Sequence, residues 1–166
     1  MQTVLFLCTG NYFRSRFAEM LFNFRAAEKG LEWRAVSRGL ALELGSNNVG
    51  PISTYVLDAL QRRAIPIPAE LRYPEQATDG DFESADMVVA LKGVEHKPYV
   101  QKRHPAWVDK TVYWDVTDMI PTADYDPLAV VEEGVIDLIE ELLVEAGHFP
   151  KQRSHTDNAD NADFHG

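Results

Sequence analysis

A short segment near the N-terminus combines side chains that can bind a phosphate and attack it. It reads Cys8-Thr9-Gly10-Asn11-Tyr12-Phe13-Arg14-Ser15. A cysteine thiolate is a nucleophile, and the planar fork of an arginine grips two oxygens of a phosphate at once. Gly10 and Asn11 are residue types that readily adopt the left-handed backbone of a tight loop. This pattern of a cysteine, five residues, then Arg14-Ser15 predicts nucleophilic attack on phosphorus.

The segment must lie between a strand and a helix to work in this way. The apolar run Thr3–Leu7 predicts a buried strand before it, and apolar residues at helical spacing predict a helix over Ser15–Lys29 after it. Backbone N–H groups of such a loop and the helix N-terminus together form an anion cradle. The same surroundings favour the thiolate of Cys8, to which Ser15 can donate its hydroxyl. The alternative is an ordinary buried cysteine at a strand end, which the Gly-Asn loop argues against.

Strand-like and helix-like segments alternate along the rest of the chain. Further strands are expected at Trp33–Ser37, Met87–Leu91 and Thr111–Val116, and further helices at Pro51–Arg63, Gly93–Arg103 and Leu128–Ala146. This alternation predicts an α/β fold, a single-domain three-layer sandwich with a central four-stranded parallel sheet and helices on both faces. Ligands of such sheets bind at the carboxyl ends of the strands. We expect one domain over residues 1–149 and a polar, disordered tail over 150–166.

The charge of the chain is unevenly distributed. The net charge of the 166 residues is −10, which argues against a nucleic-acid partner. Residues 1–40 nevertheless hold six basic and three acidic side chains, whereas residues 121–150 hold eight acidic and no basic ones. An anionic substrate therefore remains compatible with the loop at Cys8.

The composition also indicates the cellular compartment and whether the chain has membrane-spanning segments. A single cysteine excludes an internal disulfide or a multi-cysteine zinc site and fits a cytoplasmic location. No apolar run approaches the roughly 20 residues of a membrane helix, and the start of the sequence lacks the pattern of a signal peptide. No membrane partner is expected, and the oligomeric state is left open.

The segment Val4-Leu5-Phe6-Leu7-Cys8-Thr9-Gly10-Asn11, continuing through Arg14-Ser15 to Ala18-Glu19, resembles the low-molecular-weight protein tyrosine phosphatase family in its bacterial form. The resemblance extends to Val36-Ser37 and Gly39, where the family has a serine that supports the loop asparagine, and to the run from Ala85 to Val89. It implies a phosphoric monoester hydrolase that acts on phosphotyrosine through a phosphocysteine, without a metal or other cofactor.

Site residues follow from the same resemblance. Cys8 is the implied nucleophile, Arg14 and the backbone of Thr9, Gly10, Asn11, Tyr12, Phe13 and Ser15 are implied to bind phosphate, and Asn11, Ser15 and Ser37 support the loop. Phe13 stands where many members have a second cysteine, and Arg16 replaces a frequent proline. We expect Tyr12 to line the mouth of the pocket, where its ring can stack on an aryl group.

The reaction also needs a carboxylic acid to protonate the leaving oxygen. The loop before the last helix offers Asp118, Asp124 and Asp126. Asp126-Pro127 is the dipeptide usual in the family, but it is equally typical of an N-cap followed by proline. Asp118 lies four residues after Trp114, a spacing that resembles bacterial relatives. We favour Asp118 and keep Asp126 as the alternative.

Two alternatives to a tyrosine phosphatase remain. The same chemistry could act on another phosphorylated side chain, such as phosphoarginine, or on a small phosphoester. A non-catalytic phosphate-binding module is also conceivable, although binding alone needs no thiol. Arg38 and Lys92 follow predicted strands, and Glu95-His96 comes a turn later. These charged groups are either solvated surface residues or part of a positive rim around the site.

Overall fold

A four-stranded parallel sheet organises the molecule, in the strand order β2-β1-β3-β4. The computed structural model describes residues 1–147. The central strand β1 (Gln2–Cys8) pairs on one side with β2 (Trp33–Gly39) and on the other with β3 (Met87–Ala90). The edge strand β4 (Val112–Tyr113) pairs with β3. The predicted parallel sheet is therefore confirmed, whereas the predicted tail lies outside the described residues.

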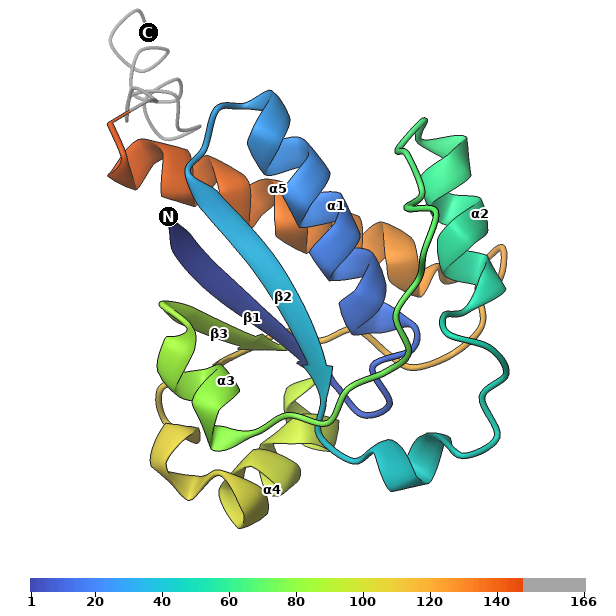
Figure 1. The fold of residues 1–166 in the computed structure, drawn as a ribbon, viewed down its shortest axis with the longest axis vertical. Coiled ribbons are helices and arrows are strands. Elements are labelled where there is room, and N and C mark those ends of the chain that lie inside the picture. The colour runs from blue at the N-terminus through green and yellow to red at the C-terminus, as the bar shows by residue number, and fades with distance from the viewer. Residues whose placement is uncertain (148–166) are drawn as a thin grey trace, which may run out of the picture.

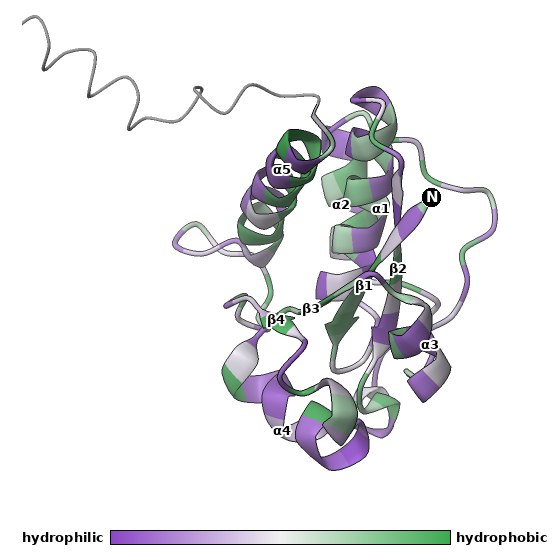
Figure 2. Cartoon of the chain, turned by 90° about the vertical axis from the view of Figure 1, so that its left-hand side faces the viewer, coloured by the Kyte–Doolittle hydropathy of each residue, from purple (hydrophilic) through white to green (hydrophobic). Residues whose placement is uncertain are grey.

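Helices cover both faces of the sheet, as Figures 1 and 2 show. One face carries α1 (Arg14–Glu28), α2 (Thr54–Arg62) and α5 (Pro127–Glu145). The other carries α3 (Asp79–Ser84) and α4 (Gly93–Arg103). Two short 3-10 turns, Leu42–Gly45 and Pro105–Trp107, lie in the connections. No helix within residues 1–147 combines the length and apolar character needed to cross a membrane.

The central strand is buried on both faces because its side chains alternate between two cores. Val4 and Phe6 pack with α1, α2 and α5 in the larger core, and Leu5 and Leu7 pack with α3 and α4 in the smaller one. All four are fully buried. Burying each such side chain stabilises the fold by about 1.5–3 kcal/mol, so the strand that ends at Cys8 is held firmly from both sides.

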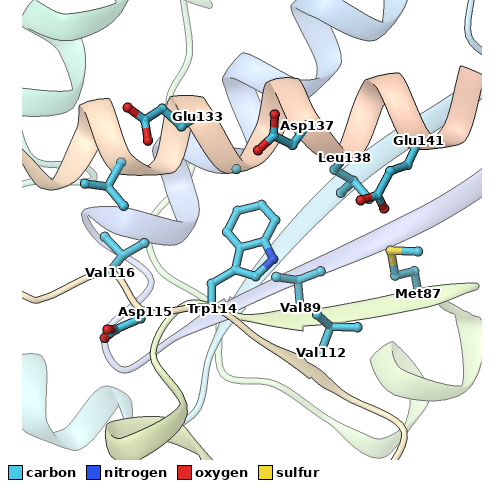
Figure 3. A pocket seen from close by; sticks show the side chains of 12 residues that line it. Met87, Val89, Val112, Trp114, Asp115, Val116, Glu133, Asp137, Leu138 and Glu141 are labelled. Carbon is cyan, nitrogen blue, oxygen red and sulfur yellow. The ribbon is translucent and has the colours of Figure 1, made fainter. Parts of the chain in front are cut away.

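Two elements differ from the sequence prediction. The fourth strand has only two residues rather than Thr111–Val116. Beyond it the backbone N–H groups of Trp114 and Val116 still donate to carbonyls at the end of β3, but only an isolated bridge continues the ladder. The side chain of Trp114 points toward α5 (Figure 3). A Cβ on Gly134 of α5 would lie 2.7 Å from Cζ3 of this indole, so the ring packs directly on the helix backbone. Helix α3 was not predicted, although a capping box between Thr78 and Asp81 marks its start.

A groove of about 460 Å³ opens beside Trp114, between α5 and the outer edge of the sheet (Figure 3). Its floor is apolar, and the exposed carboxylates of Glu133, Asp137 and Glu141 line its helix side. No residue of the segment from Cys8 to Ser15 lines it. The groove is therefore separate from the loop that the sequence singled out.

Because the sheet is parallel, the carboxyl ends of all four strands lie at the same edge of the sheet. Cys8 is in register with Gly39, and Leu7 with Ala90. The connections that follow β1, β2, β3 and β4 therefore begin side by side. A Cβ on Gly39 would lie 2.8 Å from the carbonyl oxygen of Thr9, so only glycine permits this close approach of β2 to the loop after Cys8.

Candidate active site

Cys8 lies between the end of β1 and the start of α1, as predicted. It is the last residue of the strand and is buried, while α1 begins at Arg14. Its Sγ lies 2.9 Å from Oγ of Ser15 in the first turn of the helix. The side chain of Asn11 donates to the same Ser15 oxygen, which leaves the serine hydroxyl free to donate to sulfur. The arrangement can stabilise a thiolate and hold it under the helix N-terminus.

Asn11 shapes the loop from inside. Its φ of 52° lies in the left-handed region, as expected. Its Nδ2 donates to Oγ of Ser15 at 2.9 Å and to Oγ of Ser37 at 3.0 Å. Ser37, on β2, therefore contacts the loop asparagine as the resemblance implied. The expectation of a left-handed Gly10 is wrong, because its φ is not positive.

Arg72, which the sequence did not single out, and Glu19 of the family motif complete this support. Arg72 donates to Oδ1 of Asn11 at 2.9 Å and to Oγ of Ser37 at 3.0 Å. Its charge is paired with Glu19 of α1 at 3.1 Å, and Ser37 donates to the same carboxylate at 2.6 Å. Because a guanidinium can only donate, Oδ1 of Asn11 must be the acceptor, and the direction of its amide is fixed. Arg72 therefore fixes the side chain of Asn11, and Asn11 in turn stabilises the conformation of the loop.

Arg16, in place of the family's frequent proline, ties three segments together. It is buried and donates to the carbonyl of Pro51 at 2.9 Å and to that of Arg72 at 2.8 Å. Burial and the neighbouring charge of Arg72 lower the pKa of Arg16 to about 10. The group still carries its charge at neutral pH, so it adds positive potential behind the loop.

Arg14 forms a two-pronged ion pair with Glu95 in the first turn of α4. Its Nη1 donates to Oε1 of Glu95 at 3.0 Å, and its Nη2 donates to Oε2 at 2.7 Å. Nη1 also donates to the carbonyl of Val116 at 2.9 Å. Only 2% of the Arg14 side chain is exposed. The arginine predicted to bind phosphate is thus held in place by α4 and by the segment after β4.

Glu95 itself is enclosed by donors. Oε2 accepts from Thr9 Oγ1, and His96 Nε2 lies 3.1 Å away. Burial alone would raise the pKa of Glu95, but hydrogen bonds from His96, Arg14 and Thr9 outweigh it and hold the pKa well below the usual carboxyl range. Burial lowers the pKa of His96, which is fully enclosed, so its imidazole is neutral at neutral pH. Glu95 and His96 are therefore part of the site and not surface groups.

Asp118 lies beside the loop, at the mouth of a cavity of about 320 Å³. Its Oδ2 is 3.8 Å from Nη2 of Arg14, and its side chain is exposed. The segment before it is anchored, since the Tyr125 hydroxyl accepts from the backbone N–H of Thr117 at 3.0 Å. Nonpolar and aromatic side chains line much of the cavity; these are Tyr12, Phe13, Tyr55, Met119 and Ile120.

Tyr12 and Phe13 both contribute to this cavity, which fits the expectation for Tyr12. The Tyr12 hydroxyl donates to the carbonyl of Val49 at 2.5 Å, which holds the ring at the rim. Phe13 also packs against the larger core and meets Tyr55 in an edge-on contact with ring centroids 6.5 Å apart. Aromatic faces thus border Asp118 on one side of the loop.

Asp126 occupies the position of an N-cap. Its Oδ1 accepts from the backbone N–H of Leu128 at 3.0 Å, and Pro127 is the first residue of α5. Asp124 is exposed in the same connection. Neither residue lines the cavity at Asp118. The geometry therefore favours Asp118 over Asp126 as the acid.

The Asp126→Ala variant is expected to lose stability and keep its activity. Removing an N-cap side chain leaves a helix N–H without its partner and lowers the free energy of unfolding by about 1 kcal/mol. Denaturant titration measures this loss, and kcat for an aryl phosphate should stay within about twofold of the wild type. Asp126→Asn is the matched control, because asparagine caps equally well. A drop of kcat in both variants would instead assign Asp126 to the chemistry.

The proposed positive rim finds little support at Arg38 and Lys92. Arg38 lies 3.4 Å from both Glu75 and Asp81, and Lys92 lies 2.6 Å from Asp115. These acids offset both cations. The positive charge near the loop comes instead from Arg14, Arg16 and Arg72, of which Arg72 was not predicted.

Comparison with known proteins gives a consistent result. The family model described as low molecular weight phosphotyrosine protein phosphatase matches residues 3–146. Among solved structures, the chain is 28% identical to a low molecular weight protein tyrosine phosphatase from T. tengcongensis, with a TM-score of 0.69 over 85% of this chain and 99% of that chain. No curated protein matches the chain.

Two more distant structures share the fold. Wzb from Vibrio vulnificus, solved in complex with benzylphosphonate, is 15% identical, with a TM-score of 0.70 over 84% of this chain and 98% of that chain. The YwlE arginine phosphatase from Geobacillus stearothermophilus is 24% identical, with a TM-score of 0.67 over 90% of this chain and 99% of that chain. At these identities the likeness extends to the fold alone.

Proposed function

The chain belongs to the low molecular weight phosphotyrosine protein phosphatase family, and we propose that it hydrolyses phosphotyrosine in proteins. It is a cysteine-dependent phosphatase that needs no metal, and its substrates are phosphorylated molecules. The observation that carries the proposal is the position of Cys8, whose Sγ lies 2.9 Å from Ser15 Oγ under the start of α1, beside a cavity lined by aromatic side chains.

The first step is attack on phosphorus by the Cys8 thiolate. The equatorial oxygens of the phosphoryl group bind to the backbone N–H groups of the loop and to Arg14, whose charge stabilises the transition state. The thiolate forms the S–P bond while the P–O bond to the leaving group breaks. Asp118 gives its proton to the departing oxygen, so the alcohol or phenol leaves uncharged.

The second step releases phosphate. Asp118, now ionised, takes a proton from water, and the resulting hydroxide attacks the phosphocysteine. The S–P bond breaks and Cys8 leaves as a thiolate, which the Ser15 hydroxyl stabilises by a hydrogen bond. Phosphate is the product, and the enzyme returns to its starting state without a cofactor.

Phosphotyrosine fits the cavity at Asp118 better than the alternatives do. Tyr12, Phe13 and Tyr55 present aromatic faces, and Met119 adds a polarisable thioether. Such side chains pack against a phenyl ring with favourable stacking. A phosphoserine lacks a ring to fill this space, and a phosphoarginine would offer the same aromatic faces only a small planar guanidino group.

Substrate preference is tested with peptides of one sequence that carry phosphotyrosine, phosphoarginine or phosphoserine. We expect kcat/KM for phosphotyrosine to exceed the other two by at least about tenfold. Tyr12→Ala should narrow this advantage by about two- to tenfold, because a stacked aromatic pair is worth about 0.5–1.5 kcal/mol. Tyr73→Ala, which removes an exposed ring outside the cavity, is the control. A preference for phosphoarginine would contradict the proposed substrate.

We further infer that the protein works in the cytoplasm. The single cysteine must remain a reduced thiol to act as the nucleophile, and the cytoplasm keeps thiols reduced. Phe13 occupies the place of the second cysteine that protects the nucleophile in many relatives, so the reduced state depends on the compartment.

A further inference from the structure

The guanidinium of Arg14 has three edges, and two of them are occupied. An arginine carries five N–H donors in a fixed plane. The edge formed by Nη1 and Nη2 faces the carboxylate of Glu95, with one contact to each oxygen, at 3.0 and 2.7 Å. The remaining hydrogen of Nη1 is donated to the carbonyl of Val116 at 2.9 Å. Three of the five donors are therefore committed.

The third edge, formed by Nε and the other Nη2 hydrogen, has no hydrogen-bond partner among residues 1–147. In the same part of the chain, no fully buried polar side-chain atom lacks a partner. Nε is therefore not sealed inside the protein, although the side chain as a whole is 98% covered. Two parallel donors on one edge match two oxygens of a phosphate.

Glu95 could in principle compete with phosphate for Arg14, because a carboxylate and a phosphate both prefer a guanidinium edge. The occupied edges argue against competition. Glu95 takes the far end of the guanidinium and leaves the side edge open, so both anions can bind at once. We propose that Glu95 is a positioning residue, which clamps the far end of Arg14 so that the Nε edge meets the phosphoryl group.

The neighbours of Glu95 make the clamp rigid. Nδ1 of His96 accepts from the backbone N–H of Lys92 at 2.9 Å, so the proton of the neutral imidazole is on Nε2, which faces Glu95 at 3.1 Å. Thr9 donates to the same oxygen of Glu95. The Glu95 carboxylate thus contacts both Arg14 and Thr9, which belongs to the loop after Cys8. Glu95 therefore links α4 both to Arg14 and to the loop after Cys8, and it keeps the loop and the guanidinium in a fixed relative position.

This role requires that Arg14 binds the transferred phosphoryl group, as proposed above. Positioning and competition then predict opposite effects of removing the charge. If Glu95 positions Arg14, Glu95→Gln frees the guanidinium to move and slows the reaction, since misplacement by about 1 Å can cost about 10²-fold in rate. If Glu95 competes, Glu95→Gln opens the site and lowers KM.

The test measures kcat and KM for p-nitrophenyl phosphate and the Ki of inorganic phosphate in Glu95→Gln. We expect kcat to fall by at least about tenfold, while KM and Ki change by less than about threefold because the lost alignment is offset by the lost negative charge. Glu95→Asp, which keeps the charge, should recover part of kcat. Glu140→Gln removes an exposed carboxylate of α5 and should leave all three constants unchanged.

Three outcomes would overturn the role of Glu95 in an active wild-type enzyme. These are a KM lowered by more than about threefold in Glu95→Gln, an unchanged kcat per folded molecule, and a loss of kcat that Glu95→Asp does not relieve at all. An inactive wild type would instead contradict the proposed function itself.

A measurement on the wild type covers the case in which the variants do not fold. Inorganic phosphate should shift the NMR resonance of Arg14 Nε–H and slow its exchange with water, while the carboxyl carbon of Glu95 keeps its shift. A moving Glu95 resonance together with an unmoved Nε–H would show displacement of the carboxylate and refute the clamp.

Discussion

Replacing Cys8 with serine is expected to lower kcat for an aryl phosphate by at least about 10³-fold, the scale of losing a covalent nucleophile. A serine hydroxyl has the size to occupy the same place next to Ser15, but it does not ionise near neutral pH and has no base within the loop to activate it. Steady-state hydrolysis of p-nitrophenyl phosphate in the presence of EDTA measures the loss.

The control for Cys8→Ser is a measurement of phosphate binding by the variant. The loop amides, Arg14 and the helix N-terminus are untouched, so inorganic phosphate should bind the variant with a Kd within about tenfold of that of the wild type. Retained binding without turnover separates a lost nucleophile from a collapsed loop. Substantial turnover by Cys8→Ser would exclude the thiolate as the nucleophile, and a wild type that binds phosphate but hydrolyses no phosphoester would indicate a binding module.

Asp118→Asn is expected to lower kcat for a phosphate ester with a poor leaving group by about 10²- to 10⁴-fold, the usual contribution of a general acid. An alkyl phosphate needs a proton on its departing oxygen, and asparagine cannot supply one. The first step with p-nitrophenyl phosphate should be much less affected, because p-nitrophenolate leaves without protonation. Comparison of kcat/KM for the two substrates, which reports only the steps up to the phosphocysteine, therefore measures proton donation directly.

Asp126→Asn is the matched control for this experiment, since it removes the other candidate acid but keeps the cap oxygen that contacts Leu128 N–H. Its kcat should stay near that of the wild type for both substrates. Full activity of Asp118→Asn toward the alkyl phosphate, with loss in Asp126→Asn, would reverse the assignment. A movement of the loop that brings Asp126 to the phosphate would then have to accompany substrate binding.

Local sequence patterns were sufficient to predict most of the fold. The strand before Cys8 is buried between two cores, so its residues form a continuous apolar run. The helix after it faces only one core, so its apolar residues recur at helical spacing. The strand at Val112 was predicted too long because the segment after Tyr113 keeps single hydrogen bonds to the end of β3 without a regular ladder, a difference that an apolar pattern does not show. Helix α3 has only six residues, too few to show a helical period.

The site was only partly predictable, for a physical reason. Cys8, Asn11 and Arg14 lie in one continuous segment from the end of β1 to the start of α1, so their spacing in the sequence indicates the chemistry. Glu95 and Arg72 reach the loop from distant segments, and a single charged side chain after a strand or in a connection looks like any solvated group. Their roles depend on hydrogen-bond partners that only the folded chain brings together.

Asp126 illustrates a different limit. Asp-Pro before a helix satisfies both the family pattern and the rules of helix capping, so sequence alone leaves the two uses equally acceptable. The hydrogen bond to Leu128 N–H and the 3.8 Å approach of Asp118 to Arg14 distinguish them in space.

The most direct test of the mechanism is to trap the covalent intermediate. In Asp118→Asn, p-nitrophenyl phosphate should still phosphorylate Cys8, whereas release of phosphate should be slow because no carboxylate activates water. Rapid mixing should therefore give a burst of about one p-nitrophenolate per enzyme, and mass spectrometry after acid quench should find one phosphoryl group on the peptide that contains Cys8. A burst-free reaction with no phosphoryl group on that peptide, in an enzyme that still hydrolyses the substrate, would contradict attack by Cys8.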